Sequence, residues 1–123
     1  MKTLLILGFL LLLTTTPGQA QESGCTDAAN AWAMKLNDAK HSEIYRNHAR
    51  SDCAWAGKWV KQYAQVTDQA NRERMCNDLV LIWTHKDCGF FRDVINPDAY
   101  TPCKAWSREM FKHCMDNDVK WFP

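Results

Sequence analysis

The chain has 123 residues, of which 15 are basic and 14 acidic, and it contains six cysteines and six tryptophans. Lys2 is the only charged residue in the N-terminal leader, so without the leader 14 basic side chains balance 14 acidic ones. Nucleic acids and anionic lipid surfaces attract proteins that carry a basic excess. The balance therefore argues against either as the partner, and the length suits a single domain.

The first residues are typical of a cleavable export signal. Lys2 precedes an apolar run at residues 4–13, which is too short to cross a bilayer as a stable helix. Signal peptidase requires small residues before its cleavage site, and Ala20 is the last of these here. We expect residues 1–20 to be the signal peptide and residues 21–123 to be one secreted, extracellular domain. No later segment is apolar enough for a transmembrane helix, so we expect no membrane insertion.

An even number of cysteines in a short exported chain is typical of disulfides, and not of metal ligands or reactive thiols. The cysteines are Cys25, Cys53, Cys76, Cys88, Cys103 and Cys114. None of them forms the C-x-x-C pair that is common in zinc sites. We expect three disulfides, each contributing roughly 3–4 kcal/mol through the unfolded state. Spacing alone does not choose among the possible pairings.

In chain order, the first predicted element is a helix that begins near Cys25. Thr26 and Asp27 offer side-chain oxygens that can cap its N-terminus. Its apolar stripe consists of Cys25, Ala29, Trp32 and Leu36. The helical pattern weakens from residue 37, and residues 40–50 are mostly polar, so a bend and then a link are expected there.

Two further helices are predicted by capping residues that precede an apolar stripe. Ser51 and Asp52 should cap one of them, and Thr67 and Asp68 the next. The first stripe contains Cys53, Ala56, Val60 and Tyr63, flanked by Trp55 and Trp59. The second stripe contains Cys76, Leu79, Val80 and Trp83. This spacing places Trp83 in the predicted core.

A loop is expected between Gly89 and Tyr100, because Asn96-Pro97 is a turn signal. Thr101 followed by Pro102 predicts the start of the last helix. One face of this helix carries Cys103, Trp106, Met110 and Cys114. No segment alternates in the manner of a strand. The sequence therefore predicts an all-α protein, a small disulfide-linked bundle of three to four helices.

Residues capable of catalysis or metal binding occur, but in unsuitable patterns. His85 and Asp87 resemble the His-Asp pair of secreted phospholipases A2, yet a lysine separates them and no glycine-rich calcium loop precedes them. His41, Glu43 and His48 lack the H-E-x-x-H spacing of a zinc site. No hydroxyl residue has a nucleophile-elbow context. We expect no enzyme activity, no bound metal and no cofactor.

Aromatic residues supply the candidate binding surface. Trp55 and Trp59 flank a stripe that is already wide, so one of the two indoles is expected at the surface as an interface anchor. Two other aromatic pairs lie in the predicted loop and beyond the last cysteine. The candidate residues are Trp55, Trp59, Phe90, Phe91, Trp121 and Phe122.

The chain contains Cys53-x-Trp55 followed by Tyr63, then Cys76, then Cys88 with aromatic residues after it, and finally Phe111-Lys112-His113-Cys114. This pattern resembles the extracellular domain of receptor activity-modifying proteins. The resemblance implies a three-helix bundle that pairs with class B G-protein-coupled receptors and helps to shape their peptide pocket. It places Phe90-Phe91 where the family's aromatic pair approaches the bound peptide.

The same resemblance implies the inter-helix bridges Cys25–Cys76 and Cys53–Cys114. The chain departs from the family in several ways: it lacks the transmembrane helix, the N-terminal cysteine and the Trp-Pro-Asn motif, and it has Cys103 in addition. Cys88–Cys103 is then the natural remaining pair.

These observations predict a secreted, non-enzymatic binding protein that acts on an extracellular protein partner, such as a membrane receptor or an ion channel. A soluble modulator and a venom or gland toxin are two forms of this function. The alternative is a small helical carrier of an apolar ligand, which requires an internal cavity of roughly 300 Å³ or more. Insect odorant-binding proteins are such carriers, but they need two cysteines four positions apart, and this chain has none.

Overall fold

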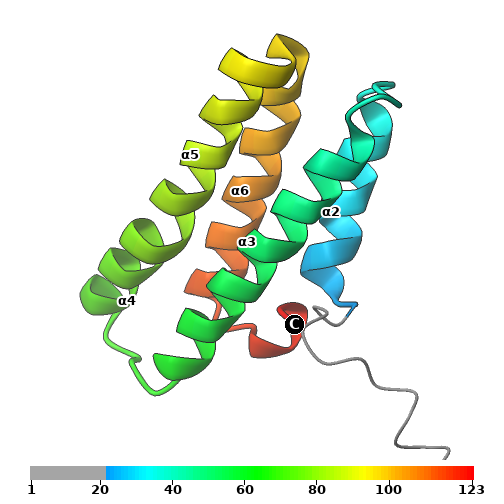
Figure 1. Ribbon diagram of the computed structural model, residues 1–123. Coiled ribbons are helices and arrows are strands. Elements are labelled where there is room, and N and C mark those ends of the chain that lie inside the picture. Colours follow the sequence, from blue (N-terminus) through cyan, green and yellow to red (C-terminus); the bar gives the residue numbers. More distant parts are fainter. Residues whose placement is uncertain (1–21) are drawn as a thin grey trace, which may run out of the picture.

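The computed structural model describes residues 22–123, and the predicted signal peptide at residues 1–20 lies outside this range. The chain runs up and down the molecule in successive helical rods (Figure 1). They are α2 (Gly24–Lys35), α3 (Ser42–Gln62), a long rod at residues 69–95, and α6 (Tyr100–Met115). Residues 22–123 contain no strand. The predicted all-α, disulfide-linked bundle is confirmed.

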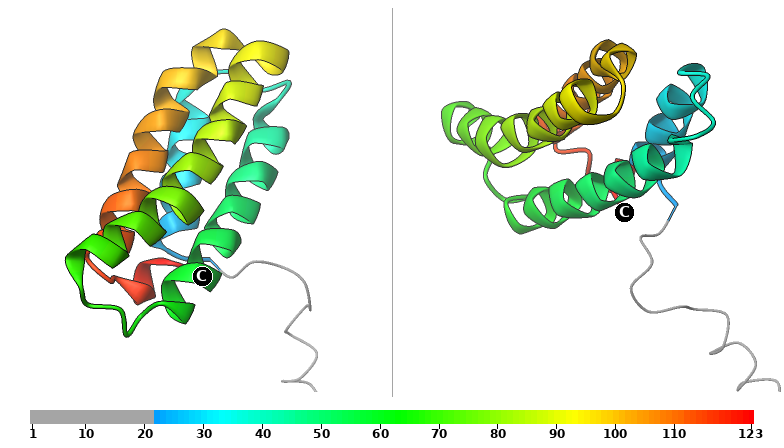
Figure 2. Two further views of the ribbon diagram at one scale, coloured as in Figure 1. Left: turned by 90° about the vertical axis from the view of Figure 1, so that its left-hand side faces the viewer. Right: turned by 45° about the horizontal axis from the view of Figure 1, so that its top comes forward.

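The rods form two antiparallel helical hairpins that pack against each other (Figure 2). One hairpin consists of α2 and α3, and the other consists of the long rod and α6. A short connection at residues 63–68 joins the hairpins, and Asp68 caps the helix that follows, as predicted. Aromatic rings fill the space between the hairpins: Trp32 lies 5.6 Å from Tyr45, 6.0 Å from Phe91 and 6.1 Å from Trp106.

The long rod contains two π-helical turns, one in its interior and one at its end. It comprises α4 (Gln69–Cys76), the π-helix η1 (Asn77–Leu81), α5 (Ile82–Phe90) and the π-helix η2 (Phe91–Ile95). A short 3₁₀ turn, η3 (Pro97–Ala99), leads into α6. The predicted loop between Gly89 and Tyr100 is therefore mostly helical.

The π turns change which side chains are buried. The fully buried residues recur at every fourth position instead of every 3.6, namely Cys76, Val80, Thr84 and Cys88. Thr84 donates a hydrogen bond to the Val80 carbonyl and pairs with Ser107 of α6. The wider turn rotates Trp83 away from the core, and its side chain is 41% exposed. The prediction that Trp83 is buried was wrong, because it assumed a regular α-helix.

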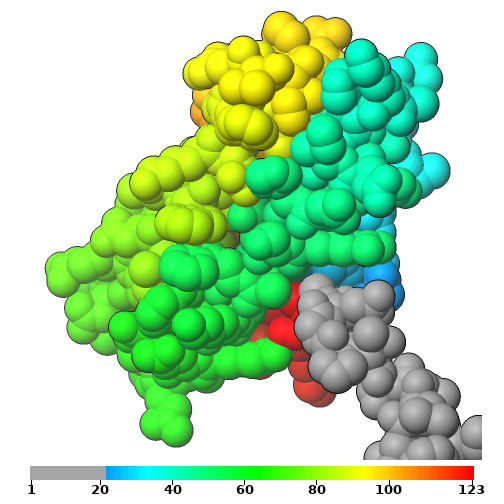
Figure 3. Space-filling model, viewed as in Figure 1, coloured from blue at the N-terminus to red at the C-terminus, as the bar shows by residue number. Residues whose placement is uncertain are grey.

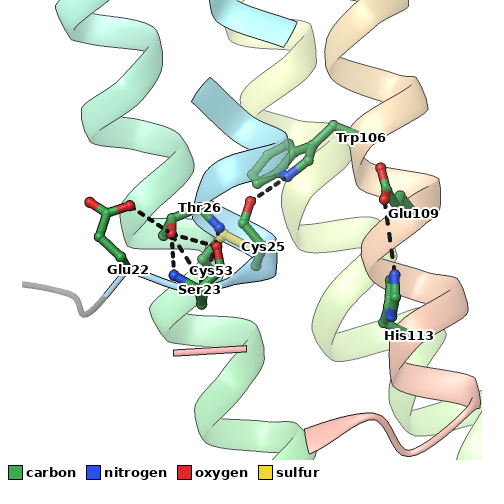
Figure 4. Close-up of a disulfide and its surroundings, with 8 residues drawn as sticks. All are labelled: Glu22, Ser23, Cys25, Thr26, Cys53, Trp106, Glu109 and His113. Carbon is green, nitrogen blue, oxygen red and sulfur yellow. Dashed lines mark hydrogen bonds and ion pairs between the residues drawn. A yellow bond between two sulfur atoms is a disulfide. The ribbon is translucent and has the colours of Figure 1, made fainter. Parts of the chain in front are cut away.

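The first hairpin also differs from its predicted boundaries. Ser23, not Thr26 or Asp27, caps α2. Its hydroxyl accepts a hydrogen bond from the Thr26 N–H, and the Thr26 hydroxyl accepts one from the Ser23 N–H, which makes a capping box (Figure 4). The predicted link within residues 40–50 and the predicted cap at Ser51 and Asp52 were wrong, because α3 begins at Ser42 and continues through these positions. The polar first half of α3 buries only Tyr45 and Ala49, so it shows no conspicuous apolar stripe.

All six cysteines are buried and form three disulfides. Cys25–Cys53 joins α2 to α3, whereas Cys76–Cys114 and Cys88–Cys103 join the long rod to α6. The pairs Cys25–Cys76 and Cys53–Cys114, which the resemblance implied, were wrong, and Cys88–Cys103 is confirmed. Each disulfide thus lies within one hairpin, and none joins one hairpin to the other. The contact between the hairpins depends on non-covalent packing.

The buried guanidinium of Arg72 ties the connection between the hairpins to the end of α6. It donates to the backbone carbonyls of Tyr63 and Cys114 at 3.0 and 2.8 Å, and also to the Val66 carbonyl and the Asn117 side chain. Tyr63 and Cys114 lie at helix C-termini, whose last carbonyls lack partners within the helix. Arg72 therefore satisfies the ends of two helices at once.

The last residues fold back beneath the bundle toward the start of α2 (Figure 1). Trp121 stacks on His113 with a centroid separation of 3.9 Å, and Phe122 is buried. Two glycines allow this close approach: a side chain on Gly24 would collide with the Trp121 indole, and one on Gly57 would press on Phe122. The C-terminal segment is thus part of the core.

Candidate binding face

The structure distributes the six candidate binding residues between the surface and the core. Trp55 and Trp59 are half-buried, and Phe90 is 42% exposed. Phe91 is 1% exposed and Phe122 is 4% exposed, so the prediction that these two residues belong to a binding surface was wrong. Phe91 turns inward because its π turn directs it at Trp32 and Tyr45. Trp121 is half-buried in its stack on His113.

Trp55 and Trp59 belong to a larger row of aromatic rings where α3 meets the long rod. Trp83 stacks on Trp55 with centroids 4.5 Å apart and an interplanar angle of 19°. Trp59 meets the edge of Trp55 at 5.7 Å, and Tyr63 follows at 6.0 Å from Trp59. We call Trp55, Trp59, Tyr63 and Trp83 the aromatic ladder. Figure 3 shows the side of the molecule on which α3 and the rod meet.

Backbone geometry holds the ladder in place. Trp55, Trp59 and Tyr63 are spaced at i, i+4 and i+8 on α3, so they share one side of that helix. The Trp55 indole donates a 2.7 Å hydrogen bond to the carbonyl of Leu79, which lies in η1. The same π turn rotates Trp83 outward against Trp55. The ladder is therefore fixed before any partner arrives, which lowers the entropy cost of binding.

A surface groove of about 440 Å³ continues the ladder toward the connection between the hairpins. Its walls are Tyr63, Val66, Met75 and Leu79, and its rim carries Asn71, Arg74 and Asp78. Tyr63 and Leu79 connect the groove to the ladder, because one belongs to the ladder and the other holds Trp55. We call the ladder and the groove together the aromatic face.

Cations border this face. The Lys58 ammonium lies 5.3 Å from the centroid of Trp59, and that of Lys86 lies 5.9 Å from Trp83. Both contacts are within the range of cation–π attraction. Within residues 22–123 neither lysine has an ion-pair partner, nor does Arg74 at the groove rim. Asp78 is the one acidic side chain that lines the groove.

A carboxyl pair lies beside the ladder, across the contact between the hairpins. Asp52 of α3 is 3% exposed and its Oδ2 has no hydrogen-bond donor within residues 22–123. Burial, and then a hydrogen bond and repulsion with the Asp87 carboxylate of α5, raise the pKa of Asp52 to about 10. A protonated Asp52 can donate to Asp87, whose Oδ2 lies 3.6 Å from His48 Nδ1. Asp52 and Asp87 therefore face each other across the contact between the two hairpins.

Two other histidine–carboxylate pairs lie closer together than His48 and Asp87, and we assign both a structural role. His41 Nδ1 lies 3.0 Å from Asp38 Oδ2, and His113 Nδ1 lies 2.9 Å from Asp118 Oδ2. Donation by the Tyr45 hydroxyl, followed by His41 and Asn96, lowers the pKa of Asp38 to about 2 and ties together two loops. Neither pair lines the groove. Among residues 22–123, no group of three or more potential ligands is arranged to hold a metal ion.

Sequence reasoning found two members of the ladder and missed the partnership with Trp83 and Tyr63. Both residues were assigned to core stripes. The fourfold spacing of Cys76, Val80, Thr84 and Cys88 is the signal that could have revealed the π turn and the outward rotation of Trp83.

No family model matches the chain, and no curated protein or solved structure is significantly similar to it. In the described part of the chain, residues 22–123, no helix is both long and apolar enough to cross a membrane. The three intramolecular disulfides are typical of extracellular proteins.

Proposed function

We propose that this chain is a secreted, non-enzymatic binding protein whose aromatic face docks onto an extracellular protein partner, such as a membrane receptor or an ion channel. The observation that carries the proposal is the partly exposed, pre-positioned aromatic ladder with Trp55 stacked on Trp83. Tryptophan and tyrosine dominate the energetics of protein interfaces when they are rigid and partly desolvated. The chain would act on this partner either as a soluble endogenous modulator or as a venom or gland toxin.

The disulfides support the proposal, because they make each helix of the face rigid. Cys25–Cys53 fixes α3 from within its hairpin, and Cys76–Cys114 fixes the rod next to η1. A surface whose side chains are already ordered loses little conformational entropy on binding. A domain of this small size can therefore bind a partner at a low cost in conformational entropy.

A carrier of an apolar ligand is the second candidate, and the groove is the observation that favours it. Its volume of about 440 Å³ is large enough for a small ligand, in the range of roughly 300–1,000 Å³. The groove opens at the surface and has a polar rim, whereas a carrier needs to enclose most of its ligand. The groove therefore fits an apolar side chain of a protein partner better.

The proposal can be tested with fluorescently labelled protein on cells that display a panel of receptors and channels. Wild type should bind saturably, and Trp55→Ala and Trp83→Ala should each weaken binding by roughly tenfold or more. Met34→Ala is the matched control, because Met34 is 77% exposed on α2, outside the aromatic face. Unchanged binding by both tryptophan variants would contradict the proposal. An apolar molecule extracted from the native protein would favour the carrier instead.

A further inference from the structure

The aromatic face has the length and shape of a site for a helix. Trp55 and Tyr63 are eight residues apart on α3, which corresponds to about 12 Å along the axis. On a partner helix, side chains at i, i+4 and i+7 cover about 10.5 Å, and such anchors are the usual contacts in helix-in-groove recognition. One anchor can rest on the Trp55–Trp83 stack, one on Trp59, and one in the groove beyond Tyr63.

The charged residues at the border of the aromatic face determine which sign of charge a partner should carry. Lys58 and Lys86 lie over the ladder and Arg74 lies at the groove, without ion-pair partners among residues 22–123. Asp78 offsets only one of these charges. Interfaces place positive patches against negative ones, because like charges repel during approach. The complementary helix carries acidic residues on both sides of its apolar stripe.

We propose that the aromatic face binds an amphipathic, acid-flanked helix of an extracellular protein. This inference rests on the proposed function and specifies the partner's binding element. A second copy of the chain fits less well, since a two-fold interface would place Lys58 and Lys86 against the same cations. An anionic membrane fits less well too, because residues 21–123 carry no net charge and the groove is concave.

Two synthetic helices test the inference directly. Each has about 16 residues, with leucines at i, i+4, i+7 and i+11, and the flanking positions carry glutamate in one peptide and lysine in the other. Tryptophan fluorescence of the full mature protein reports binding, because three indoles lie in the face. The glutamate peptide should bind about tenfold more tightly than the lysine peptide at low salt, and the difference should shrink at high salt.

Protein variants then locate the effect. Trp83→Ala should weaken binding of the glutamate peptide by roughly tenfold, whereas Met34→Ala should leave it unchanged. The double variant Lys58→Glu, Lys86→Glu should reverse the preference, so that the lysine peptide binds better. Both lysines are exposed, so these changes spare the core. Circular dichroism of each variant confirms that it is folded.

Several results would overturn the inference. These are equal affinity for the two peptides, a preference that survives the double charge reversal, and stronger binding to phosphatidylserine vesicles than to the glutamate peptide. A wild-type dimer in sedimentation that Trp83→Ala abolishes would assign the face to a second copy instead. If the tryptophan variants lose cell binding while the peptides show no preference, the proposed function stands and only the helix inference fails. If the tryptophan variants retain cell binding, the proposed function itself fails.

Discussion

The buried carboxyl group of Asp52 should make the stability of this protein depend on pH in an unusual direction. The pKa of Asp52 rises from its ordinary value of 3.8 to about 10 in the fold. Between these values the folded chain binds one more proton than the unfolded chain, so stability falls as pH rises. The slope for one proton is about 1.4 kcal/mol per pH unit, which gives about 4 kcal/mol between pH 5 and pH 8.

The substitution Asp52→Asn tests this reasoning. Asparagine is already neutral and its amide can donate to Asp87, so it avoids the cost of protonating a carboxylate. We expect the variant to be more stable than wild type at pH 7, by up to about 4 kcal/mol, and equal to it near pH 4. Asp116→Asn, at an exposed position, is the matched control and should change stability by less than about 0.5 kcal/mol.

Guanidinium unfolding monitored by tryptophan fluorescence, at intervals from pH 4 to pH 8, measures the effect. His48 lies beside Asp87, so His48→Gln in both backgrounds isolates the part due to Asp52. The low pKa of Asp38 affects stability only as pH falls below about 4, toward 2, and does not interfere. Wild-type stability that is flat from pH 5 to pH 8, together with destabilisation by Asp52→Asn, would refute the assignment.

Three further predictions concern the architecture. Arg72→Ala should cost at least about 3 kcal/mol in unfolding experiments, because it leaves several buried acceptors unpaired, and Arg74→Ala should cost almost nothing. Replacing both Cys88 and Cys103 with serine should cost about 3 kcal/mol, and peptide mapping of the native protein should recover this pair; other pairings would contradict the fold. Gly24→Ala should lower stability by about 1–3 kcal/mol and alter near-ultraviolet circular dichroism, since the new methyl group displaces a stacked indole; an unchanged spectrum would contradict the docking.

The helical class and most buried positions follow from sequence alone. The stripe of Cys103, Trp106, Met110 and Cys114 lies in the core as its spacing predicts. This prediction succeeded because α6 is a regular helix, so a period of 3.6 residues maps sequence onto one face. The same rule failed for Trp83, because a π turn shifts the period locally. The fourfold spacing of Cys76, Val80, Thr84 and Cys88 is the local sign of this shift, and only the positions of the neighbouring helices show that Trp83 leaves the core.

The number of disulfides was predictable from the sequence, but their pairing was not. The even cysteine count and the expected export signal predict oxidised thiols, because both can be read from amino-acid composition without the fold. Pairing depends on which helices become neighbours, and here each disulfide closes its own hairpin. The first half of α3 shows the same limit: its residues look polar in sequence, and only packing against Trp32 and Phe91 reveals that Tyr45 belongs to the core.

The sequence by itself therefore determined a small helical bundle held by three disulfides, and it identified aromatic residues as the candidate binding groups. Only the tertiary structure decided which aromatics reach solvent and which of them act together. The physical reason is that helix formation and burial depend on periodic local patterns, whereas a surface such as the Trp55–Trp83 stack arises from two helices that are distant in sequence. Their contact depends on the twist of each helix and on the packing between the two hairpins.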